Sequence, residues 1–108
     1  PDNLPWLDGP KHSEQRVLEQ YRQFVQLLKV SGLGVASLVL DQRGAWRLTL
    51  DNGLELLLGR EQMSKRLWRL VQVYATVIKP KVSGIGQVDL RYSNGFALSW
   101  RKQATAGK

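Results

Sequence analysis

The chain has 108 residues, 43% of them hydrophobic and 23% charged, which is typical of one globular domain with its own core. It contains no cysteine and a single histidine, so disulfides, zinc–thiolate sites, iron–sulfur clusters and thiol nucleophiles are excluded. The net charge of +7 is uneven: residues 1–61 hold seven Lys and Arg against eight Asp and Glu, and residues 62–108 hold nine against one. The basic second half predicts an acidic partner, which is nucleic acid, an anionic membrane surface or an acidic protein.

The first quarter of the chain predicts an extended segment followed by a helix. Residues 1–12 are rich in proline and glycine, so we expect them to be extended or turned and to pack on the domain through Trp6 and the leucines beside it. Ser13 is a suitable N-cap for an amphipathic helix over residues 14–30. That helix is expected to end near Gly32, and its apolar stripe consists of Val17, Tyr21, Phe24 and Leu28.

Next come three segments in which apolar residues alternate with a period of two. They cover residues 35–40, 46–50 and 54–58, and the turn Asp51-Asn52-Gly53 is a strong hairpin signal. They predict a three-stranded antiparallel meander.

The remainder predicts a second helix and a second hairpin. An apolar stripe at Met63, Leu67, Leu70, Tyr74 and Val77 predicts a helix over residues 61–78, stopped by Pro80. Residues 83–86 are expected as a loop, and strands over 88–92 and 96–100 are expected to pair across a turn at 93–95. Together these elements predict an α+β fold: a mainly antiparallel sheet with two amphipathic helices packed on one face. We expect residues 1–100 to be the domain and residues 101–108 to be a flexible basic tail.

The chain offers little enzyme chemistry. His12, Ser13 and Glu14 are triad residue types, but adjacency in sequence is not triad geometry. Gly32-x-Gly34 and Gly84-x-Gly86 are each half of a dinucleotide fingerprint and lie in the wrong context. We therefore expect no enzyme, no metal site and no cofactor.

The basic face of the second helix favours a different function. Arg60, Lys65, Arg66 and Arg69 have the charge to contact phosphates, so a basic α+β nucleic-acid-binding domain is an alternative hypothesis. A solvated helix face explains the same run of charges.

The last predicted strand lacks the usual protection of a sheet edge. Residues 95–100 contain no charged residue and no proline. Such an edge is either covered by the protein itself or pairs with a strand from a partner, and the pattern leaves both open. A proline at Ala97 or Ser99 removes a backbone donor. We expect one of the two to abolish strand addition and the other to disturb pairing with the preceding strand.

An ordered set of motifs resembles the FtsQ family of bacterial cell-division proteins. The motifs are Gly9-Pro10, WRLTLDNG at 46–53, Leu58-Gly59-Arg60, Lys65-Arg66-Leu67 and VDLRYSNGFALSW at 88–100. In that family a cytoplasmic tail, one transmembrane helix and a POTRA domain precede a periplasmic β domain, and residues 4–100 resemble most of the β domain. The chain begins with Pro1 and has no apolar run near the ~20 residues that span a membrane. We therefore expect a fragment or processed chain without the anchor, the POTRA domain and the first strands of the β domain.

The resemblance implies a non-enzymatic scaffold on the periplasmic side of the inner membrane, at the division septum. Family members hold the FtsB–FtsL pair, link early and late division proteins and help to control septal peptidoglycan synthesis; their last strand receives a strand from the C-terminal part of FtsB. Residue by residue, this implies that Arg43 pairs with an FtsB glutamate and that Arg91 and Tyr92 lie beside the docking strand. The strand and its turn comprise Asn94, Gly95, Phe96, Ala97, Leu98, Ser99 and Trp100.

Overall fold

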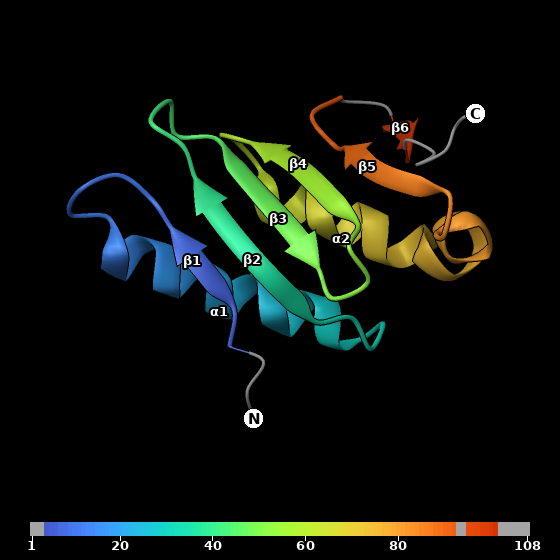
Figure 1. Cartoon of the computed structure of the whole chain (residues 1–108), viewed down its shortest axis with the longest axis horizontal. Coiled ribbons are helices and arrows are strands. Elements are labelled where there is room, and N and C mark those ends of the chain that lie inside the picture. The colour runs from blue at the N-terminus through green and yellow to red at the C-terminus, as the bar shows by residue number, and fades with distance from the viewer. Residues whose placement is uncertain (1–3, 93–94, 102–108) are drawn as a thin grey trace, which may run out of the picture.

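The protein is a single sheet with both helices on one of its faces, as a computed structural model shows (Figure 1). The structure describes residues 4–92 and 95–101. Its helices are α1 (Glu14–Lys29) and α2 (Met63–Val73). Its strands lie side by side in chain order: β1 (Trp6–Asp8), β2 (Val35–Leu40), β3 (Trp46–Leu50), β4 (Glu55–Gly59), β5 (Ile85–Asp89) and β6 (Ala97–Trp100). The predicted α+β class is confirmed.

The sheet is mixed, with an antiparallel majority. The meander β2–β3–β4 is antiparallel, as predicted, and β5 and β6 also pair antiparallel. The pairs β1–β2 and β4–β5 are parallel, because in each case the chain leaves the sheet through a helix and returns in the same direction. Neither parallel pair was predicted: β1 has only three residues and little alternation, and the pattern of β4 and β5 indicated only antiparallel hairpins.

Helix α1 begins and ends where the sequence predicts. Ser13 is its N-cap, although its hydroxyl donates to the Pro10 carbonyl rather than capping the first turn. At the other end the Gly32 N–H donates to the Lys29 carbonyl at 3.0 Å, and the Leu33 N–H donates to the Leu28 carbonyl at 3.2 Å. This pair of bonds is a Schellman motif, and it requires the positive φ of +68° that Gly32 adopts.

The segment predicted as the second helix, residues 61–78, contains two kinds of helical turn, and a third follows it. Regular helix α2 gives way to a π-helical segment, η1 (Tyr74–Ile78), and then to the 3₁₀ turn η2 (Lys79–Lys81), which contains Pro80. The wider π turn shifts the phase of the apolar stripe by one residue. As a result Ile78 is fully buried, whereas Val77, which the regular spacing placed on the stripe, is 38% exposed.

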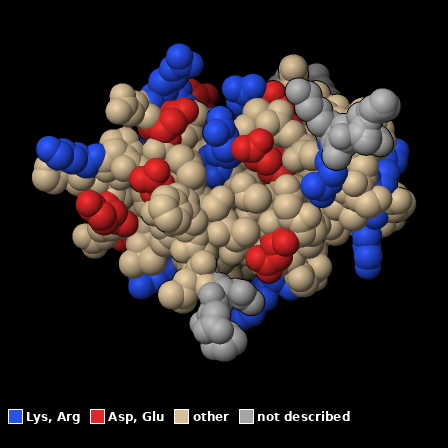
Figure 2. Space-filling model, in the orientation of Figure 1, with Lys and Arg blue, Asp and Glu red and all other residues tan. Residues whose placement is uncertain are grey.

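The core lies between the sheet and the helices. Alternate residues of the central strands enter it, and on the helix side it is closed by Phe24, whose ring meets that of Trp46 edge to face at 6.3 Å. The opposite face of the sheet has no helix among the described residues. Figure 2 views this open face and shows acidic and basic side chains mixed over it. Arg47 on β3 and Glu55 on β4 form an ion pair, with Nε and Oε2 3.2 Å apart.

The last hairpin differs from the prediction in its first strand. Strand β5 begins at Ile85, within the segment predicted as a loop, and ends at Asp89 rather than residue 92. A bulge between Ile85 and Gln87 inserts one extra residue, so Ile85 and Val88 both reach the core although they are three residues apart. Strand β6 falls within the predicted range, and the predicted turn residues Ser93 and Asn94 lie outside the described part of the chain.

Candidate functional site

Strand β6 is the last strand of the sheet and, among the described strands, pairs only with β5. Arg101 directly follows β6, and its N–H donates to the carbonyl of Gly84, the residue before β5, at 2.7 Å. Because N–H groups alternate in direction along a strand, those of Ala97 and Ser99 point to β5 as well. The N–H groups of Leu98 and Trp100 point away from the sheet.

This geometry corrects the expectation for the two proline variants. Ala97 and Ser99 are two residues apart and share one side of the strand. Proline at either position therefore disturbs pairing with β5, and neither removes an outward donor. The outward donors belong to Leu98 and Trp100.

The side chains of β6 lie mostly in solvent. Ala97, Ser99 and Trp100 are exposed, and Leu98 packs partly against the core opposite Val88. Phe96, just before the strand, also packs partly against the core. Trp100 has the same parity as Leu98 but is 63% exposed, because the strand ends at the margin of the sheet.

Tyr92 and Arg91 lie just beyond the end of β5. Tyr92 follows the buried Val88 by four residues, a spacing that would put both side chains on one face of a continued strand. Because Tyr92 lies beyond the end of β5, its side chain is instead 56% exposed. Arg91 is held by its own chain: its Nε and Nη2 donate to the two carboxylate oxygens of Asp89 at 2.8 and 2.7 Å. These bonds lower the pKa of Asp89 and raise the pKa of Arg91.

Arg43 and Arg91 are brought together, although 48 positions separate them in the sequence. Both line a hollow of about 550 Å³ at the end of the sheet where β2, β4 and β5 finish. We call it the arginine hollow; its lining is Asp41, Arg43, Ala45, Gly59, Arg60, Glu61, Arg66 and Arg91.

The carboxylate of Asp41 organises the turn that carries Arg43. It accepts the N–H of Ala45 at 2.9 Å and the N–H of Arg43 at 2.8 Å. The bond from Ala45 is the main cause of a lowered pKa at Asp41, to which the Arg43 N–H adds. The hollow therefore combines a fixed turn with several guanidinium groups, an arrangement suited to acidic side chains.

Two arginines of the predicted basic helix face are not simply solvated. Arg66 Nη1 donates to the Leu58 carbonyl at 2.8 Å, and Arg69 Nη2 donates to the Tyr92 carbonyl at 2.8 Å. Sequence reasoning missed these roles. The available signal was position: both residues precede a buried leucine, Leu67 or Leu70, and so lie at the boundary between the helix and the sheet.

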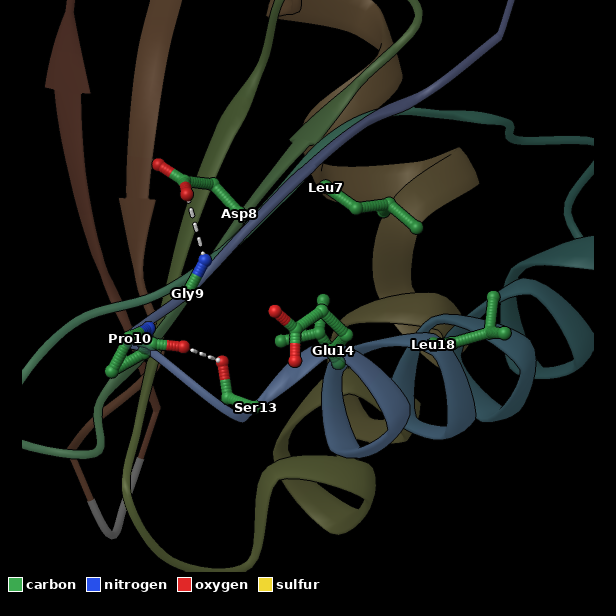
Figure 3. A pocket seen from close by; sticks show the side chains of 8 residues that line it. Leu7, Asp8, Gly9, Pro10, Ser13, Glu14 and Leu18 are labelled. Atoms are coloured by element: carbon green, nitrogen blue, oxygen red, sulfur yellow. Dashed lines mark hydrogen bonds between the residues drawn. The ribbon is translucent and has the colours of Figure 1, made fainter.

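A second hollow lies at the β1 edge of the sheet, far from β6 in the strand order, between β1 and the first turns of α1 (Figure 3). It measures about 440 Å³. The Asp8 carboxylate there accepts the Gly9 N–H at 2.8 Å, and the Ser13 hydroxyl is bonded to a carbonyl rather than to a base. Within residues 4–92 and 95–101, no three His, Asp or Glu side chains are grouped to hold a metal ion. No helix in the same part of the chain has the length and apolar character to cross a membrane.

Comparisons with known proteins decide the family. A family model described as "Cell division protein FtsQ/DivIB, C-terminal" matches residues 1–91. The chain belongs to the FtsQ/DivIB family of cell-division proteins. It is 42% identical over 101 residues to "Cell division protein FtsQ" of Coxiella burnetii, covering 94% of this chain and 42% of that protein. The protein of the same name from Cellvibrio japonicus is 38% identical over 105 residues, covering 97% of this chain and 33% of that protein.

The FtsQ relatives extend the match beyond the family model. The Cellvibrio match spans 105 of the 108 residues and so necessarily includes β6, which follows the last residue that the family model matches. The chain spans 33% to 42% of the length of these two relatives. Membership in the family supports a role in cell division and interaction with other division proteins.

Proposed function

We propose that this chain is a non-enzymatic module of the division machinery that binds the FtsB–FtsL pair by β-augmentation at β6. In the proposed complex a strand from the C-terminal part of FtsB pairs with the outward N–H and C=O groups of β6. The module acts on the periplasmic side of the inner membrane at the septum, where it links early and late division proteins and helps to control septal peptidoglycan synthesis.

The observation that carries the proposal is the position of β6 at the edge of the sheet, with the donors of Leu98 and Trp100 directed outward. A sheet edge without charge or proline is a template for an added strand. Three of its four side chains are exposed, so a partner strand meets little steric resistance.

Side chains near β6 are suited to select the partner. The exposed Tyr92 is a large amphipathic residue of the type enriched at binding hot spots. The arginine hollow favours a segment with acidic side chains and raises its association rate. Backbone pairing then supplies affinity, and these groups supply selectivity.

Nucleic-acid binding is not proposed. Three of the four residues on which that hypothesis rests, Arg60, Arg66 and Arg69, donate to backbone carbonyls of their own chain. The division family supports a protein partner.

The test is the affinity of the folded chain for a peptide of the FtsB C-terminal segment. Leu98→Pro removes an outward donor, and Leu98→Ala is its matched control because it removes the same packing and keeps the N–H. We expect Leu98→Ala to bind like the parent within a few-fold and Leu98→Pro to bind at least about tenfold more weakly. Thermal melts check that both variants fold. Equal affinity of the two would refute strand addition at this edge, and collapse of binding in moderate salt would indicate simple charge attraction.

A further inference from the structure

Arg69 ties α2 to the connection between β5 and β6. Its Nη2 donates to the carbonyl of Tyr92 at 2.8 Å and also lies 3.3 Å from the carbonyl of Gly95. One of these residues follows β5 and the other precedes β6. A single guanidinium on the helix layer therefore holds both sides of the loop that delivers the chain to the edge strand.

Strand β6 depends on few other attachments among the described residues. It has four residues, and only Leu98 among them packs against the core. At its far end Arg101 continues the pairing through its N–H and donates weakly from Nη2 to the Asn52 carbonyl at 3.3 Å. Short edge strands with exposed side chains open at low free energy, so the bonds at their ends determine how often they are in place.

We propose that Arg69 is a positioning residue for partner binding: it holds the entry to β6 so that the free protein presents a preformed edge. This inference rests on the proposed function. A strand can add only to an edge that is already in the β conformation, and the apparent affinity falls in proportion to the fraction of molecules that have it. Arg69 raises that fraction without touching the partner.

A purely structural role for Arg69 makes a different prediction. If its bonds simply stabilised the domain, their loss would loosen the whole fold together. If they position β6, the loss is local: the β6 amides that face β5 exchange faster, and the central strand β3 keeps its protection. The partner's association rate then falls and its dissociation rate stays near the parental value.

The experiment compares Arg69→Gln with Lys65→Gln. Lys65 is exposed and lies one turn earlier on the same helix, so its substitution removes the same charge and leaves the loop carbonyls untouched. Amide hydrogen exchange is measured on both variants without partner, and binding rates are measured with the FtsB C-terminal peptide.

We expect Arg69→Gln to speed exchange at Ala97 and Ser99 about tenfold, with β3 unchanged, and to weaken peptide binding about tenfold through the association rate. Lys65→Gln should match the parent. Unchanged β6 exchange in Arg69→Gln, or an equal rise in β3, would overturn the proposal. If the parent itself fails to bind the peptide, the proposed function fails, whereas the exchange measurement still decides whether Arg69 positions β6.

Discussion

Gly59 lines the arginine hollow at a point where a small added group would meet two of its arginines. It ends β4 with φ of +77°, and a Cβ atom at this position would lie 2.8 Å from Arg66 Nη1 and 3.1 Å from Arg91 Cγ. The left-handed backbone alone costs a residue with a Cβ about 1–2 kcal/mol. The flexible end of Arg66 must also move, which costs its hydrogen bond to the Leu58 carbonyl, worth about 1 kcal/mol or more.

We therefore expect Gly59→Ala to lower the free energy of unfolding by about 2–3 kcal/mol. For a domain of this size that corresponds to a fall in Tm of roughly 10–20 °C, measured by circular dichroism. The matched control is Gly32→Ala. Gly32 has a similar φ of +68°, but apart from its chain neighbours no atom of the described residues lies within 4 Å of its Cβ position. That variant should therefore lose only the backbone cost of about 1–2 kcal/mol. If the two variants have the same Tm, the arginines beside Gly59 add nothing to the cost of the substitution, and the close packing described for the hollow is wrong.

Two further predictions concern charge. Asp89→Asn should have a lower Tm than the parent at pH 7. A carboxyl group whose pKa is lowered by folding stabilises the protein above its pKa in the unfolded chain, about 3.9, and this stability is lost as the pH falls through its pKa in the folded protein. The difference in Tm between the variant and the parent should therefore close at low pH. Melts from pH 7 to pH 2 check this, and a constant gap would contradict it. Arg43→Glu and Arg91→Glu should each weaken FtsB-peptide binding at low salt, by up to about tenfold, without unfolding the domain. Arg91→Glu should also lose some stability, since it faces Asp89; parental affinity in either folded variant would remove that arginine from the site.

The parts of the fold that follow from apolar periodicity were predictable from the sequence. The spacing of Val17, Phe24 and Leu28 locates α1, and all three are buried. The alternation in residues 46–50 and 54–58 places the buried faces of β3 and β4 correctly, because in a half-covered sheet a one-residue slip would expose every leucine. These signals are local and repeat several times within one element.

The features that escaped prediction depend on contacts between distant segments. Strand β1 is a strand only because β2 lies beside it, and nothing local in its three residues demands that pairing. The bulge at β5 and the π turn at Tyr74–Ile78 each change the phase of a pattern by one residue, which periodicity cannot anticipate.

The edge position of the last strand was predictable, because the final hairpin strand of an antiparallel arrangement has one neighbour. The detailed contacts of the residues proposed for the site were not. The sequence did not indicate that Arg91 pairs with Asp89 or that Arg69 donates to the Tyr92 carbonyl. All arginines carry the same charge, and only the folded chain determines which carbonyl or carboxylate each one can reach.

The central claim is that a partner strand pairs with the outer side of β6, and amide hydrogen exchange at single-residue resolution tests it most directly. On adding the FtsB C-terminal peptide to the folded chain, exchange at Leu98 and Trp100 should slow strongly, since their N–H groups gain carbonyl partners. Exchange at Ala97 and Ser99, whose N–H groups already face β5, should change much less. A peptide that binds while Leu98 and Trp100 exchange as they do in the free protein would contradict the claim and place the partner elsewhere on the domain.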